Sequence, residues 1–198
     1  MKNILSGILF LGLTLSLTAQ DFDKNLASAR TAYSSGNLED ARFAMQQMLN
    51  DIDVIIGKEV VKLLPAKLET RTSNTSNDNV TANTGLAGVI IHRDYGADDK
   101  TANLDIMSNS PLVGSLNAIL SLPFVGNSGD GTQKTVKVHG YKGVLQKSVD
   151  TETNKSNYTL QIPLNSTLLT LEVQDTSEAE ILKMANAIPV PQIVKLVQ

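Results

Sequence analysis

Apolar positions recur with a helical period in the first third of the chain. The first row is Phe22, Leu26, Ala29 and Tyr33. Its steps of four, three and four predict one face of a helix. Residues 34–37 interrupt the row, and a second, longer row runs to residue 64, where Pro65 ends the helical geometry. The pattern predicts an antiparallel helical hairpin, in which Gly57 marks either close packing or a bend.

Beyond residue 85 the apolar period changes from helical to alternating. Strands are expected at 86–95 and 101–108, and a short helix is expected to begin at Ser110-Pro111. Residues 134–149 predict one long strand or two, because the alternation slips phase at Gly140 in the manner of a bulge.

The clearest local signal is a strand hairpin over residues 157–173, followed by a helix. Asn165-Ser166 fits a two-residue turn. Counting outward from this turn, the expected facing pairs are Leu164 with Thr167, Ile162 with Leu169, Leu160 with Leu171, and Tyr158 with Val173. All lie on one side of the ribbon, so the register and the apolar pattern agree. Pro163 makes the first strand locally an edge or a bulge. Ser177 to Glu180 has capping-box spacing and opens the helix.

These elements predict an α+β protein: an N-terminal antiparallel helical hairpin followed by a mainly antiparallel sheet with helices packed on it. The connections between most strands are too short for a helical crossover. The expected organisation is a signal peptide at 1–20, the helical hairpin at 21–68, a Ser/Thr/Asn-rich linker or loop at 69–85, and the sheet domain at 86–198.

Three resemblances accompany this pattern. Residues 29–48, with an Ala-Tyr pair and a Gly-Asn turn, resemble a single tetratricopeptide-type helical hairpin. The element order over residues 86–198 is similar to the α/β/α sandwich of PsbP and Mog1-like proteins. The chain also looks like uncharacterised exported proteins of Gram-negative bacteria. The positions that carry this last likeness are Leu64-Pro65, Arg93-Asp94-Tyr95, Ser110-Pro111 and Gly140-Tyr141. The first resemblance implies protein binding, and the last implies no activity.

The N-terminus and the composition indicate export. Lys2 precedes an apolar run from Ile4 to Leu17, and small residues follow, as in a cleaved signal peptide. The run is too short for a stable membrane span. The chain has no cysteine and a net charge of −3, without a basic cluster, which excludes disulfides and disfavours nucleic-acid binding. The expected location is the bacterial periplasm or the extracellular space.

Candidate chemistry is concentrated in residues 92–99. His92 and Asp94 share one strand face and are candidates for acid–base catalysis, while Asp98 and Asp99 are candidate cation ligands.

The two residues interleaved with the catalytic candidates, Arg93 and Tyr95, are candidates for binding. No motif for a cofactor is present in the sequence. The alternative without a function is that residues 92–99 are polar only because they form a solvent-exposed strand end and turn.

The functional expectation is therefore an exported, non-enzymatic protein of the cell envelope that binds a protein partner or serves a structural role. A small hydrolase or metal-dependent enzyme using His92 and nearby carboxylates is the alternative, and would require His92 beside a carboxylate in a closed pocket. A third possibility is a carrier of a small apolar ligand, which would require a cavity between sheet and helix.

Overall fold

The computed structural model describes residues 16–82, 88–98, 100–122 and 131–197, with side chains from residue 21 onward. Contacts divide the chain into two compact units, one ending at Ile52 and the other beginning at Asp53. Most of the segment predicted as a signal peptide, residues 1–15, lies outside the described residues. In the part of the chain that the structure covers, no helix combines the length and the apolar character needed to cross a bilayer.

The first unit contains the predicted helical hairpin. Helix α1 spans Ser16–Ser34, and helix α2 spans Leu38–Leu63 and continues into the second unit. The turn between them uses Gly36 at φ 77°, a left-handed conformation that glycine adopts without steric cost. The Asn37 side chain then accepts a hydrogen bond from the Asp40 amide at 3.3 Å and caps α2.

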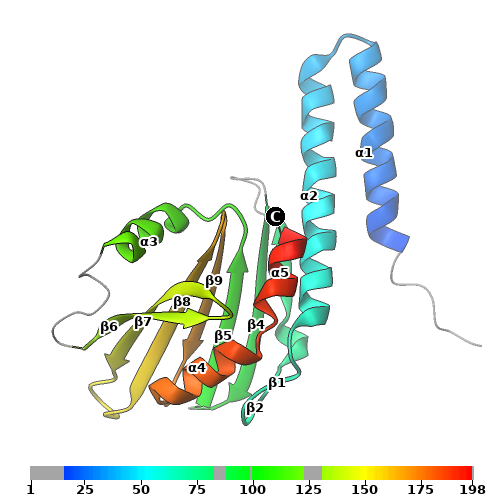
Figure 1. Cartoon of the computed structure of the whole chain (residues 1–198). Helices are drawn as coiled ribbons and strands as arrows, with labels where there is room; N and C mark the ends of the chain where they lie inside the picture. Colours follow the sequence, from blue (N-terminus) through cyan, green and yellow to red (C-terminus); the bar gives the residue numbers. More distant parts are fainter. Residues whose placement is uncertain (1–15, 83–87, 99, 123–130, 198) are drawn as a thin grey trace, which may run out of the picture. The chain divides into compact units, whose positions relative to one another are not determined.

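The second unit is built on a seven-stranded sheet in the order β3-β4-β5-β9-β8-β7-β6, in which all neighbouring strands are antiparallel (Figure 1). The strands are β3 (Asn79–Ala82), β4 (Val89–Ala97), β5 (Lys100–Met107), β6 (Gln133–Val138), β7 (Tyr141–Val149), β8 (Ser156–Leu164) and β9 (Thr167–Val173). A separate two-stranded sheet pairs β1 (Lys67–Leu68) with β2 (Arg71–Thr72). The expectation of an α+β protein with a mainly antiparallel sheet is confirmed.

Strands β8 and β9 pair in the predicted register. Leu160 faces Leu171 and Ile162 faces Leu169, and the other two expected pairs are also present. Pro163 lies beyond the last β7–β8 pair, Val144 with Gln161, so β8 is locally an edge where proline cannot donate a hydrogen bond.

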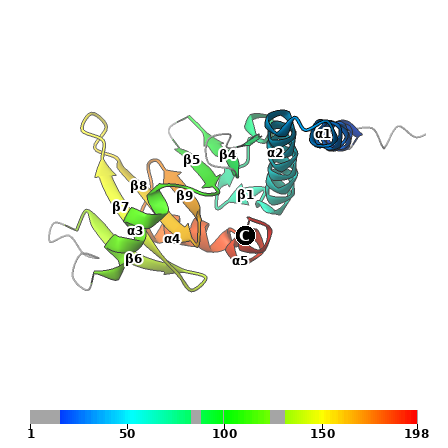
Figure 2. The ribbon, with the colours of Figure 1, turned by 90° about the horizontal axis from the view of Figure 1, so that it is seen from above.

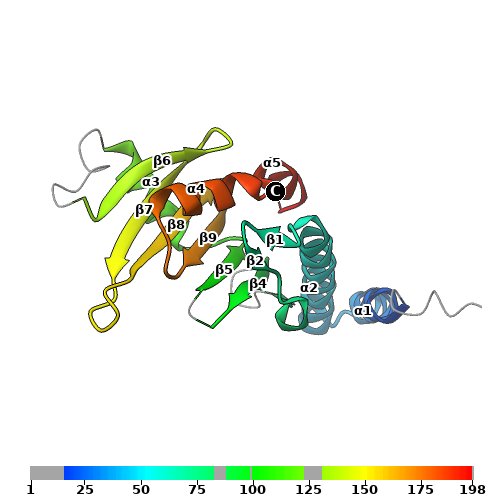
Figure 3. The same cartoon turned by 90° about the horizontal axis from the view of Figure 1, so that it is seen from below.

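Helices cover the two faces of the sheet unequally. The last part of α2, α4 (Glu178–Ala187) and α5 (Val190–Val197) pack on one face, and Figure 3 shows α4 running across the strands. Helix α3 (Leu112–Ser121) packs on the other, over β7, β8 and β9 (Figure 2).

Successive side chains of β9 point to opposite faces of the sheet, and each face has its own cluster of buried apolar side chains. Leu169 and Leu171 are fully buried beneath α4, with Ile181 and Met184 of that helix among their core neighbours. Leu168 contributes instead to the smaller cluster beneath α3. The capping box predicted at the start of α4 is present: Ser177 and Glu180 bond reciprocally.

Gly57 marks close packing. A Cβ atom there would lie 2.4 Å from Val80 Cγ1 and 2.6 Å from Val89 Cγ2. Helix α2 therefore approaches strands β3 and β4 over a position where only glycine fits without displacing these side chains.

Two segments differ from their sequence-based interpretation. Residues 69–85, expected as a polar linker, contain β2, a 3₁₀ turn (η1, Thr75–Asn77) and the edge strand β3 over their described part. Their order comes from partners far along the chain, such as the Asn74 amide bonded to the Asp94 carbonyl at 2.8 Å. The break at Gly140 is a tight turn between two strands and not a bulge: His139 and Gly140 have φ values of 48° and 87°.

Candidate functional site

The face of the sheet on the side of α3 carries a row of polar side chains on its central strands. They are His92 and Asp94 on β4, Asn103 and Asp105 on β5, and Thr170 and Glu172 on β9. Directly opposite residues of an antiparallel pair share a face, and His92 is opposite Asp105. Sheet register thus gathers this cluster from three strands.

His92 lies between two carboxylates. Its Nδ1 is 2.7 Å from Asp105 Oδ1, and its Nε2 is 2.7 Å from Asp94 Oδ1. Asp94 is held from two further sides: Asn77 donates to its Oδ2 at 3.0 Å, and the Asn103 amide, with its nitrogen turned toward Asp94, donates to Oδ1 at 3.2 Å. The imidazole joins β4 to β5 on the polar face.

The charges around His92 favour its protonated form. Partial burial of the ring lowers its pKa, but the hydrogen bond and charge of Asp105, together with those of Asp94, outweigh that effect and raise the pKa above 6.5. Both ring nitrogens can donate at once only in the imidazolium form. In that form the ring would donate a hydrogen bond to each of the two carboxylate groups.

This arrangement is poorly suited to catalysis or metal binding. A general base needs a ring nitrogen free to accept a proton, and both nitrogens of His92 face carboxylates. The His92 side chain is 33% exposed, so its ring is accessible to solvent. Among the described residues, no group of three or more His, Asp or Glu side chains is placed to hold a metal ion.

The two candidate binding residues, Arg93 and Tyr95, point to the opposite, buried face. The Arg93 guanidinium forms a bidentate pair with Asp78, at 2.8 Å from Nε and 2.5 Å from an amino nitrogen, and also donates to the Leu64 carbonyl at 3.2 Å. Tyr95 is fully buried; burial raises the pKa of its hydroxyl, and the nearby Arg93 charge partly opposes this. Both residues fix the strands and helix around them.

Asp98, one of the two candidate metal ligands, is not brought to this cluster. Asp98 lies in the β4–β5 turn at φ 52°, about 20 Å along the strand from His92. Asp99 lies outside the described residues. The second histidine, His139, is in the β6–β7 turn, where its Nε2 is 3.0 Å from the Asn186 carbonyl.

Sequence reasoning missed Asp105, although the signal was available. A two-residue turn at Asp98-Asp99 would pair residue 97 with residue 100. Counting outward from that pair, one residue at a time on each strand, places His92 opposite Asp105. Asp78, the partner of Arg93, carried no comparable signal because it lies in a segment whose composition reads as loop.

A second candidate surface lies on the helical hairpin. Apart from Phe43, which is 67% exposed elsewhere on α2, five large apolar side chains of this unit are exposed: Tyr33 at 66%, Leu38 at 65%, Met45 at 51%, Leu49 at 51% and Ile52 at 40%. The four on α2 are spaced seven, four and three residues apart, so they lie on one side of that helix. With the half-buried Phe22 and Leu26 of α1, they form what we call the apolar hairpin face.

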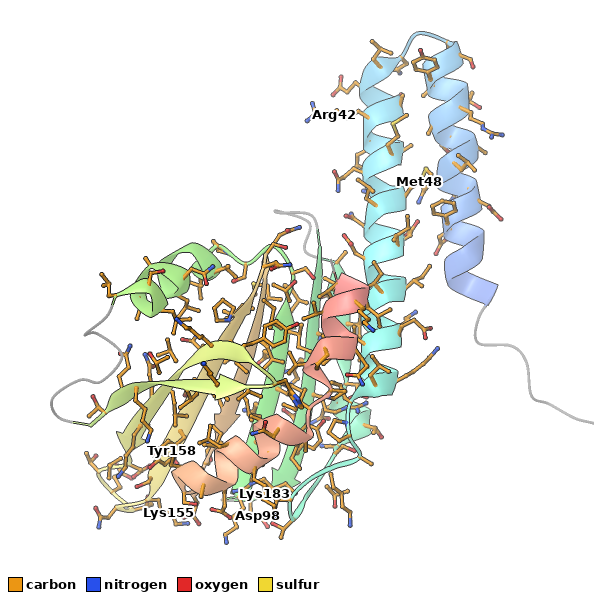
Figure 4. The ribbon with its side chains drawn as sticks, in the orientation of Figure 1. Arg42, Met48, Asp98, Lys155, Tyr158 and Lys183 are labelled. Atoms are coloured by element: carbon orange, nitrogen blue, oxygen red, sulfur yellow. The ribbon has the colours of Figure 1, made fainter. Side chains whose placement is uncertain are left out.

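The hairpin closes through small side chains and leaves this face outside. Ala29 of α1 and Ala41 and Ala44 of α2 are buried where the helices meet. Figure 4 shows Met48 directed toward the space between the two helices, whereas Arg42 points away from α1. On the other side of the hairpin, Phe43 and Ser28 line a shallow groove.

The fold and its surfaces define an α+β protein that presents a polar sheet face in one unit and an exposed apolar helical face in the other. Comparisons with protein-family models, curated proteins and solved structures find no match for this chain.

Proposed function

We propose that this chain is an exported, non-enzymatic protein of the bacterial cell envelope, and that it binds a protein partner through the apolar hairpin face. The observation that carries the proposal is the exposure of Met45, Leu49 and Ile52 on one side of α2. Large apolar side chains exposed together on one side of a helix favour a partner surface that covers them. The resemblance of residues 29–48 to a tetratricopeptide-type hairpin points in the same direction.

Export is supported by the sequence of the first 20 residues and by the lack of cysteine. Mass spectrometry of the protein recovered from the periplasm of a bacterial host tests it. Processing after Ala19 or within a few residues of it is expected, and an intact N-terminus in the cytoplasm would contradict export.

Site-specific photo-crosslinking in living cells tests the binding role. A photoreactive residue at position 49 should give discrete crosslinked protein species. The matched control is position 28, an exposed serine on the other side of the hairpin, which should give none of them. Equal crosslinking from both positions, or none from position 49, would refute the binding role.

The enzymatic alternative has one observation in its favour, the short contacts of His92 with Asp94 and Asp105. The engagement of both ring nitrogens and the 33% exposure of the side chain count against it. A His92→Asn variant separates the two: hydrolytic activity that the parent shows and the variant lacks would favour the enzyme. The carrier alternative has no such observation, since buried side chains of α4 and the sheet fill the layer between them.

A further inference from the structure

The apolar hairpin face lacks a cover in the described part of the chain. Two helices joined by a short turn cannot bury an apolar face on both sides of their contact. In this hairpin the fully buried side chains at the contact are alanines, whereas Met45, Leu49 and Ile52 remain exposed outside it. Removing such side chains from water is worth roughly 25 cal/mol for each Å² buried, so a matching apolar surface would be bound.

Two opposite charges on α1, beside this face, are placed so that they could pair with the same two charges on a second copy of the chain. Asp23 and Arg30 are exposed on α1 and lie seven residues apart, which is two helical turns on the same side. Neither forms an ion pair with the side chains that the structure describes. When two copies of α1 cross in antiparallel orientation about a two-fold axis between residues 26 and 27, Asp23 of each copy lies opposite Arg30 of the other.

We propose that the partner of the apolar hairpin face is a second copy of this chain, bound face to face about a two-fold axis, with α1 antiparallel to α1 and α2 antiparallel to α2. The proposal rests on the binding role proposed above and names the partner. A two-fold interface uses the same surface patch on both copies. A residue pair that can form between two copies therefore forms twice, once on each side of the axis.

The level of the axis on α2 follows from a contact inside the hairpin. Asn25 donates to Asp51 at 3.0 Å, so residue 25 of α1 is level with residue 51 of α2. Because the two helices run in opposite directions, the axis between residues 26 and 27 is level with residue 49 or 50. Leu49, 51% exposed, therefore lies close to the axis and meets its own counterpart.

The expected affinity is modest. The face extends over about 14 residues of each helix, roughly 20 Å, and two packed helices are about 10 Å apart. An interface of this footprint lies at the lower end of specific protein–protein interfaces. We expect dissociation at concentrations on the order of micromolar, with the rim ion pairs setting orientation more than strength.

Because the chain has no cysteine, a single introduced thiol reports on this geometry. The purified Leu49→Cys protein should form a disulfide-linked dimer under mild oxidation, since residues near a two-fold axis can bring their Cα atoms within the 4.4–6.8 Å that a disulfide needs. The matched Ser28→Cys protein should remain monomeric under the same conditions. Equal crosslinking of the two variants would overturn the proposal.

Charge reversal tests the orientation. Asp23→Arg and Arg30→Asp should each raise the dimer dissociation constant about tenfold in sedimentation analysis, because each places like charges opposite one another at two symmetric positions. The double variant restores opposite charges and should recover most of the parental affinity. Failure of the double variant to recover it, with circular dichroism unchanged, would overturn the antiparallel arrangement.

The failure of this inference can be told apart from failure of the binding role. A protein that is monomeric up to hundreds of micromolar, yet crosslinks from position 49 to a different protein in cells, would overturn self-association and leave the binding role standing. The absence of any crosslink from position 49 would overturn both.

Discussion

Replacing Gly57 with alanine separates two opposing effects that the structure allows us to weigh. In an exposed helix, Gly→Ala stabilises by roughly 0.5–1 kcal/mol, because glycine loses more backbone freedom on folding. At position 57 the new methyl group would lie 2.4 Å from Val80 Cγ1 and 2.6 Å from Val89 Cγ2. Both valines are β-branched side chains with few rotamers in which to yield.

Overpacking of this kind typically costs 1–3 kcal/mol. With two contacts below van der Waals distance, we place the cost at about 2–3 kcal/mol, and the helix gain reduces the net loss of unfolding free energy to about 1–2 kcal/mol. For a chain of this size, that lowers the melting temperature by roughly 2–8 °C.

The matched control is Gly114→Ala in α3, where a Cβ atom would have nothing within 4 Å. This variant should gain a few tenths of a kcal/mol up to about 1 kcal/mol. Thermal melts and urea titrations of both variants measure the difference. A Gly57→Ala protein as stable as the parent, beside a stabilised Gly114→Ala protein, would show that α2 does not approach β3 and β4 as closely as described.

Three further predictions concern the sheet. Leu169→Ala or Leu171→Ala removes a fully buried side chain and should cost about 2–5 kcal/mol in urea titrations, so an unchanged midpoint would contradict their placement. Asp78→Ala leaves the Arg93 guanidinium buried without its partner and should cost about 3–5 kcal/mol; adding Arg93→Met should recover much of that loss, and no recovery would argue against a buried pair. Because the pKa of His92 is raised above its unfolded value of 6.5, its stabilising effect is complete below that pH and is lost as the pH rises through the raised pKa. His92→Gln should therefore lower the unfolding free energy at about pH 6 and much less at about pH 9, whereas an equal loss at both would refute the charged form.

Strands whose partners are close in the sequence could be predicted. The Asn165-Ser166 turn fixes a register, and the apolar residues at period two agree with only that register, so Leu160 was correctly placed opposite Leu171. The helical hairpin was predictable for the same reason, since its turn at Gly36 and its apolar rows are local.

Elements that depend on distant partners could not be predicted in this way. Residues 71–82 are polar because they form a small outlying sheet and the edge of the main one, and the Asp78–Arg93 pair that holds them joins residues 15 positions apart with no turn to fix the count. At the candidate site the pairing of His92 with Asp94 was predicted from period two, whereas Asp105 required the β4–β5 register.

The position of β9 in the sheet has a consequence for the order in which the protein can fold. Among the described strands, the last in the sequence lies in the middle of the sheet, between β5 and β8, and its Leu169 and Leu171 are fully buried in the core. Until residue 173 has emerged, β5 and β8 each present an unpaired edge, which is a template for wrong strand pairing. A chain interrupted before β9 would thus consist of two incomplete sheets without a shared core, and the intact chain reaches its native sheet only in one late, long-range step.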